Sequence, residues 1–132
     1  MKVLVDTCVW SKVLRRDNPD PGLSRQLREL ILANRVVLIG PVLQEVLSGV
    51  KNRKEFALLR EYFISFDSLS LTEDVYVRAA EYYNLCKAHG INGGHTDFLI
   101  CAIVAGYGCA LFTVDADFRM FEKYLSLKLW QG

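Results

Sequence analysis

The chain has 132 residues, of which 52% are hydrophobic and 23% are charged, and its formal net charge at pH 7 is +1. This length and composition exclude a disordered chain, and we expect residues 1–132 to form a single domain. The near-zero net charge excludes attraction of a polyanion by the whole surface. Any nucleic acid must therefore bind to a local basic patch.

The cysteines and the apolar runs limit where the protein works. The chain has no CxxC pair and no Cys/His spacing typical of a zinc site, so we interpret its four cysteines as reduced thiols. The segment MKVLVDT lacks the apolar stretch of a signal peptide, and no run approaches the roughly 18 apolar residues that span a bilayer. We expect a cytoplasmic protein with no membrane partner.

The first half of the chain alternates short apolar runs with amphipathic segments. The run DNPDPG breaks the chain between two of these segments, and Pro41 suits the first turn of a helix that carries Glu45. The expected elements are a strand at 3–5, a helix at 7–16, a loop at 17–22, a helix at 24–34, a strand at 36–39, a helix from Pro41 and a helix at 53–64.

The second half continues the alternation. The expected elements are a weak strand at 68–71, a long helix capped by Thr72 and closed by His89, a flexible turn at 90–94, a helix at 97–105 capped by Thr96, a strand at 109–113, a helix from residue 115 and an edge strand at 127–130. Strands that alternate with helices predict an α/β fold, a three-layer α/β/α domain with a central parallel sheet and right-handed crossovers.

Four carboxylates stand where apolar runs begin, end or continue: Asp6 after VLV, Glu45 within PVLQEVL, Asp97 before FLICAIVA and Asp115 after LFTV. Acidic side chains are seldom buried unless they are paired or bind a metal, because desolvation of a carboxylate is costly. The carboxyl ends of parallel strands meet at one edge of a sheet, where ligands bind. The four residues therefore predict a cation site at that edge.

Oxygen ligands without His or Cys favour Mg²⁺ or Mn²⁺. Mg²⁺ held by carboxylates and waters can orient a phosphodiester, polarise its phosphoryl group and acidify a water. The chemistry indicated is phosphodiester hydrolysis.

Four motifs in order resemble those of the PIN-domain ribonucleases, and more narrowly the VapC-type toxins of prokaryotic toxin–antitoxin pairs. They are VDTCVWS at 5–11, QEVLSG at 44–49, TDFLICA at 96–102 and LFTVDADF at 111–118. They span nearly the whole chain. The resemblance implies endonucleolytic cleavage of RNA, homodimerisation and inhibition by a cognate antitoxin whose tail enters the acidic groove, with operator DNA bound only indirectly through that antitoxin.

The resemblance also assigns roles to residues. It implies that Asp6, Asp97 and Asp115 lie nearest the metal and that Glu45 helps to hold the attacking water, so that these four form the catalytic set. It implies supporting positions around that set for Thr7, Thr113 and Asp117. Cys8 departs from the pattern, because a small hydroxyl or amide residue is also common at that position.

Two short basic segments lie close in sequence to these acids. One contains Arg15 and Arg16, and the other contains Arg53 and Lys54. They are candidate RNA-binding residues, although basic runs are also common on solvated helix faces.

Other readings stay open at this point. Each acid could be a helix cap or a solvated residue. Asp6 could be the nucleophile of an aspartyl-phosphate enzyme, although Cys8 stands where one such family has a second acid. The chain could also keep the fold as a binding module for RNA or protein without catalysis.

Overall fold

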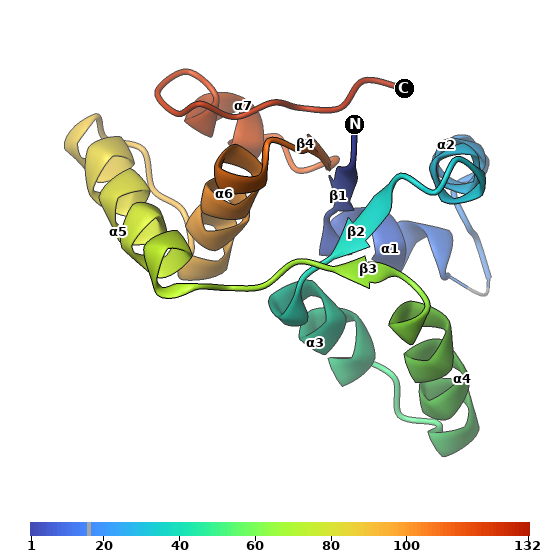
Figure 1. Cartoon of the computed structure of the whole chain (residues 1–132). Helices are drawn as coiled ribbons and strands as arrows, with labels where there is room; N and C mark the ends of the chain where they lie inside the picture. The colour runs from blue at the N-terminus through green and yellow to red at the C-terminus, as the bar shows by residue number, and fades with distance from the viewer. Residues whose placement is uncertain (16) are drawn as a thin grey trace.

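A four-stranded parallel sheet forms the centre of the molecule (Figure 1). The computed structural model describes residues 1–15 and 17–132. The strands are β1 (Val3–Val5), β2 (Val36–Leu38), β3 (Asp67–Ser68) and β4 (Ala110–Phe112). Their order across the sheet is β3-β2-β1-β4, and each neighbouring pair is parallel. Every residue of β1, β2 and β4 is buried, as expected for strands covered on both faces.

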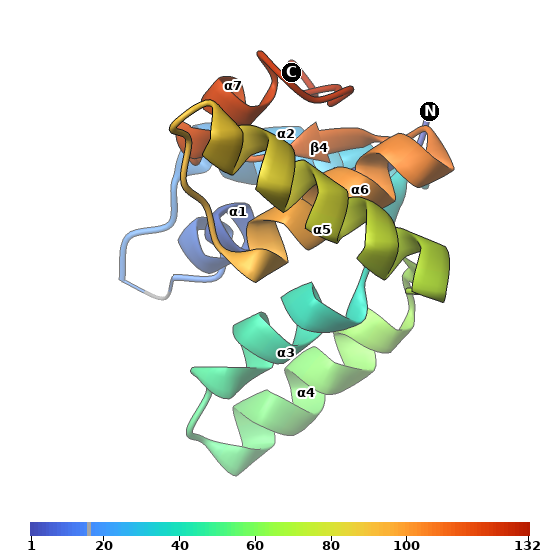
Figure 2. The same ribbon diagram turned by 90° about the vertical axis from the view of Figure 1, so that its left-hand side faces the viewer.

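Helices connect the strands and cover the sheet. They are α1 (Thr7–Val13), α2 (Pro21–Leu32), α3 (Gly40–Ser48), α4 (Arg53–Ile64), α5 (Glu73–Ala88), α6 (His95–Tyr107) and α7 (Asp117–Phe121). Figures 1 and 2 show α5 and α6 on one side of the sheet and α1 and α2 on the other, while α3 and α4 project below it as a hairpin. The α/β fold with a central parallel sheet, predicted from the alternation of elements, is confirmed.

Some boundaries differ from the sequence expectation. Helix α1 ends at Val13, and Arg16 lies outside the described residues. Helix α2 begins at Pro21, inside the segment expected to be a loop, because the Asp20 carboxylate accepts hydrogen bonds from the backbone N–H groups of Gly22 and Leu23 at 3.0 and 3.1 Å. Aspartate at the N-cap followed by proline is a strong helix start, and this local signal outweighs the chain-breaking tendency of the prolines.

The start of α6 also differs. The helix begins at His95 with Gly94 at its N-cap position, so Thr96 lies inside the helix and does not cap it. Asp97 bonds back to the Gly94 N–H at 3.0 Å and completes this end of the helix. Strand β3 is shorter than expected, and the edge strand expected at 127–130 reduces to one bridge between Leu111 and Leu129.

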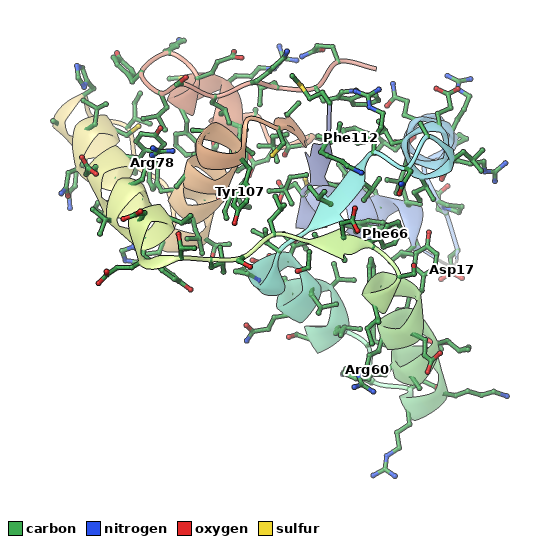
Figure 3. All side chains as sticks on the ribbon, in the orientation of Figure 1. Asp17, Arg60, Phe66, Arg78, Tyr107 and Phe112 are labelled. Atoms are coloured by element: carbon green, nitrogen blue, oxygen red, sulfur yellow. The ribbon has the colours of Figure 1, made fainter. Side chains whose placement is uncertain are left out.

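The far end of α6 is tied to the chain that leads from β3 into α5. The Tyr107 hydroxyl donates to the Ser70 carbonyl at 2.8 Å, and Figure 3 shows Tyr107 on α6 facing this connection and Arg78 between α5 and α6. The Arg78 guanidinium packs so close to Gly106 that an added Cβ would lie 3.1 Å from it. Helix α6 is thus fixed at both ends. In the ranges described, no helix has the length and apolar character needed to cross a membrane.

The turn before α6 depends on a glycine for close packing. A Cβ on Gly93 would lie 2.6 Å from the Phe121 ring and 3.0 Å from the Phe98 ring, whereas a Cβ on Gly49 would meet nothing within 4 Å. The two rings belong to α7 and α6, and their centroids are 4.8 Å apart. A small residue at 93 therefore lets the turn lie against both helices.

We expect Gly93→Ala to lower the free energy of unfolding by about 1–3 kcal/mol, since the extra methyl group overpacks a site lined by two buried rings. Gly49→Ala is the matched control, and its free energy of unfolding should change by less than about 1 kcal/mol. Urea unfolding followed by circular dichroism measures both values. Equal stability of the two variants would show that the turn moves aside at little cost.

Candidate active site

Asp6 is a buried carboxylate at the end of β1, with 7% of its surface exposed. Its backbone N–H donates to the Phe112 carbonyl of β4 at 2.9 Å, which fixes the residue between two strands. Its Oδ1 accepts from the Thr7 N–H at 2.8 Å, and its Oδ2 accepts from Thr113 Oγ1 at 2.8 Å. Asp6 therefore caps α1, but it is also held from a second element 107 residues away.

No cation in the described part of the chain pairs with Asp6. The one ion pair found there joins Lys2 to Asp67 on the surface, and Asp6 is the one charged residue that is buried. The hydrogen-bond donors to the carboxylate are neutral. An ionised carboxylate that has lost most of its water and has no positive partner favours binding of a cation.

Cys8 lies against the same carboxylate. Its Sγ is 3.3 Å from Asp6 Oδ2 and 3.4 Å from Thr113 Oγ1. Burial raises the pKa of the Cys8 thiol, so it stays protonated at neutral pH and can donate to Asp6. The residue that departs from the family pattern thus still makes a polar contact in the site.

The loop after β4 brings two more acids to this edge. Thr113 Oγ1 accepts the Asp115 N–H at 3.1 Å, and Asp115 Oδ1 accepts the Asp117 N–H at 2.9 Å. Thr113 therefore links the loop to Asp6, and its supporting role in catalysis stays a prediction. Asp115 and Asp117 are both exposed to solvent.

Asp97 reaches the site from the first turn of α6 and is half-buried. Burial raises the pKa of its carboxyl, and the negative charges of Asp115, Asp6 and Asp117 raise it further, while the hydrogen bond from the Gly94 N–H opposes this rise. Carboxylates raise one another's pKa only when they are near neighbours. Figure 2 shows why they meet: α1, the start of α6 and α7 lie on its left side, toward which the β4 arrow points.

The structure thus places four acids toward the same edge of the sheet: Asp6 after β1, Asp97 in the first turn of α6, and Asp115 and Asp117 after β4. However, no group of three or more His, Cys, Asp or Glu side chains within residues 1–15 and 17–132 is arranged to hold one metal ion. The role of Asp115 as a third direct ligand stays a prediction.

Glu45 and Thr7, two further candidate site residues, lie in different surroundings. Glu45 is exposed in the middle of α3 and makes no hydrogen bond or ion pair with described residues, so its expected role in holding a water stays a prediction. The Thr7 hydroxyl is buried and has no hydrogen-bond partner within the described chain. Buried polar groups are normally satisfied, so this hydroxyl is free to bind a water or a ligand oxygen.

The candidate RNA-binding residues lie less close to the site than the acids do. Arg15, Arg53 and Lys54 are exposed. The first turn of α4, which carries the latter two, lies at the end of the α3–α4 hairpin away from the sheet in Figures 1 and 2. Arg16 lies outside the described residues. RNA contact by these side chains stays a prediction.

Comparison with known proteins shows which family the chain belongs to. The model of the PIN domain matches residues 3–124. The chain is 25% identical over 130 residues to Ribonuclease VapC11 of Mycobacterium tuberculosis and to VapC ribonuclease Mb1587 of Mycobacterium bovis, with 96% of each chain covered. One similar solved structure is VapBC2 from Rickettsia felis bound to a promoter DNA fragment, with a TM-score of 0.78 and 17% identity over 99% of this chain and 100% of that chain. Another is FitAcB from Neisseria gonorrhoeae, with a TM-score of 0.75 and 22% identity over 98% of this chain and 96% of that chain. The chain belongs to the PIN-domain family.

Proposed function

We propose that this protein is a Mg²⁺-dependent endoribonuclease that acts as the toxin of a toxin–antitoxin pair. The observation that carries the proposal is the buried Asp6 carboxylate, which has no cationic partner among the described residues and shares its surroundings with Asp97 and Asp115. The ribonuclease names of the relatives that match over 96% of their length support the same activity.

The donor set fits Mg²⁺. The acids at this edge offer oxygen ligands, and Mg²⁺ usually binds through one or two carboxylates, with waters and substrate phosphate completing its shell. Asp6 and Asp97 would hold the ion, and Asp115 would complete the site directly or through a water. When bound, Mg²⁺ supplies charge stabilisation at the phosphoryl oxygens and a more acidic water; Mn²⁺ is an alternative ion.

The groups around Asp6 orient its carboxylate. Thr113 and Cys8 both contact Asp6 Oδ2, and the Thr7 N–H holds Oδ1, so the carboxylate cannot rotate freely. Glu45, which is exposed on α3, is the carboxylate left to accept a proton from the attacking water.

The partners follow from the same assignment. Five of the similar solved structures are described as VapBC, FitAB or FitAcB, three of them with DNA. We propose that this chain likewise forms a homodimer, is inhibited by a cognate antitoxin and meets operator DNA only through that antitoxin. Its substrate is RNA.

A catalytically silent PIN-fold module that binds RNA or protein is the second candidate. It is favoured by one observation, that no three acidic, His or Cys side chains of the described residues are grouped to hold a metal. A cleavage assay separates the two candidates.

We expect the purified protein, free of any antitoxin, to cleave a structured RNA in the presence of Mg²⁺ and to stop when EDTA is added. Asp6→Asn should slow cleavage on the order of a hundredfold or more, because it removes the charge that fixes the cation. The control is Asp74→Asn, which neutralises an exposed acid in the first turn of α5. Gel analysis of end-labelled RNA measures the rates. Cleavage that persists in EDTA would reject the metal mechanism, and absence of any cleavage would favour the silent module.

Induced expression of the chain without an antitoxin should arrest bacterial growth. Asp6→Asn and Asp97→Ala should each restore growth, whereas Asp74→Asn should leave the arrest unchanged. Growth curves at matched protein levels, checked by immunoblot, make the comparison. Equal arrest by all four proteins would assign the toxicity to something other than this site.

The raised pKa of Asp97 predicts how stability depends on pH. A carboxyl whose pKa is higher in the folded than in the unfolded protein stabilises the fold fully below its unfolded pKa, and this contribution is lost as pH rises through the folded pKa. Asp97→Asn removes the ionised form. Its Tm without metal should therefore exceed that of the wild type near neutral pH, and the difference should shrink as pH falls.

Asp74→Asn again serves as the control, because both acids occupy the first turn of a helix. Loss of a carboxylate from a helix N-terminus normally costs about 0.3–1 kcal/mol, so the Tm of this variant should fall slightly. Mg²⁺ should raise the Tm of the wild type and of Asp74→Asn, but hardly that of Asp97→Asn. A fall in Tm for both variants, with an intact Mg²⁺ response, would make Asp97 an ordinary helix cap.

A further inference from the structure

A cavity of about 530 Å³ opens beside the candidate active site, between α2, the loop after β4 and the C-terminal residues. Thr113 and Asp115 lie on its wall. Thr113 also donates to Asp6 Oδ2. The Thr113 side chain therefore contacts both the cavity and the buried carboxylate, and a molecule in the cavity would lie next to Thr113 and Asp115.

An aromatic ring forms part of the wall. Trp130 is half-buried, its backbone N–H donates to the Leu111 carbonyl at 2.7 Å, and its ring centroid lies 4.6 Å from that of Phe112, which Figure 3 labels. The indole is thus held in place before any ligand binds. A preformed aromatic wall suits a planar base, since every base has a face that can stack.

The polar groups of the wall complement this ring. Arg119 is exposed and has no ion-pair partner in the described part of the chain. The amide side chains of Gln26 and Gln131 also line the cavity, and they can both donate to and accept from a base edge. Asp115 places a negative charge on one side of the cavity. This charge disfavours a free anion in the cavity unless a cation lies between the anion and Asp115.

We propose that this cavity binds one nucleotide of the RNA, next to the phosphodiester that is cut. The base would lie against Trp130 with its edge toward the two amides, and Arg119 would contact the adjoining phosphate. The volume lies within the range of about 300–1,000 Å³ common for small-ligand sites. The inference rests on the proposed ribonuclease function and adds a source of sequence preference, because unpaired bases are read by stacking and edge contacts.

Binding is tested without cleavage, in EDTA, with a short single-stranded oligoribonucleotide. Its addition should quench the tryptophan fluorescence of the wild type. Trp130→Phe should lose most of this quenching but keep the affinity measured by anisotropy of labelled RNA, because phenylalanine can still stack. Trp130→Leu and Arg119→Gln should bind about tenfold more weakly, the lower part of the range for one base–aromatic contact.

Lys123→Gln is the control for Arg119→Gln, since Lys123 is exposed just after α7 and does not line the cavity. Circular dichroism melts confirm that each variant folds. In Mg²⁺, Gln26→Ala should shift the pattern of cleavage sites on a long RNA, whereas Lys123→Gln should not. A variant that changes folding alone would lower cleavage at every site equally.

Two results separate this proposal from the proposed function. Unchanged affinity in both Trp130→Leu and Arg119→Gln, with unchanged cleavage sites in Gln26→Ala, would overturn the nucleotide site while leaving the ribonuclease intact; the cavity would then suit a peptide. Normal quenching by RNA without any Mg²⁺-dependent cleavage would overturn the ribonuclease and retain nucleotide binding.

Discussion

The hydrogen bond from Thr113 to Asp6 joins the two strands on which the site depends. Asp6 ends β1 and Thr113 follows β4, and the 2.8 Å contact fixes where both strand ends meet. The backbone bond from Asp6 to Phe112 holds the same register. Because these donors are neutral, they orient the carboxylate without cancelling its charge. The fold thus keeps a negative charge in a buried position, which a cation can balance.

The negative charges of the acids near Asp6 lower the stability of the protein when no cation is bound. Asp97 is half-buried and near three other acids, so ionisation there works against folding. Its position depends on the tight turn before α6, where a residue larger than Gly93 would strike the rings of Phe98 and Phe121. The aromatic packing that fixes α6 and α7 therefore also sets the spacing of the acids. The core around the acids in this way offsets the repulsion among them.

Much of this arrangement follows from the sequence. Short β-branched runs predict the strands, alternation with helices predicts a parallel sheet, and the carboxyl ends of such strands share an edge. That logic places Asp6 and Asp115 correctly. The contact of Thr113 with Asp6 spans 107 residues, and composition and periodicity carry no signal for it; the family resemblance alone pointed to Thr113.

Other features depend on competing local interactions that the sequence pattern does not resolve. The start of α6 is an example, because Gly94 and Thr96 are both acceptable near a helix start, and the structure places the N-cap at Gly94, to which Asp97 bonds back. The exposure of Glu45 is another, since an acid within an apolar helix can face either way. The contact between Cys8 and Asp6 was also missed, because a cysteine in an apolar segment is usually a small hydrophobe.

The C-terminal residues show how function can be divided over this fold. Two backbone hydrogen bonds with Leu111, which make up a single parallel bridge, and the packing of Trp130 on Phe112 attach them to the outer edge of β4. The acids, in contrast, lie at strand ends and helix starts that the core fixes. The strand ends and helix starts thus hold the acids, while the C-terminal segment, held by its contacts with Leu111 and Phe112, supplies Trp130 beside them. The side chains of this segment that line the cavity, unlike those of the buried Leu125 and Leu127, can change while the acids stay the same.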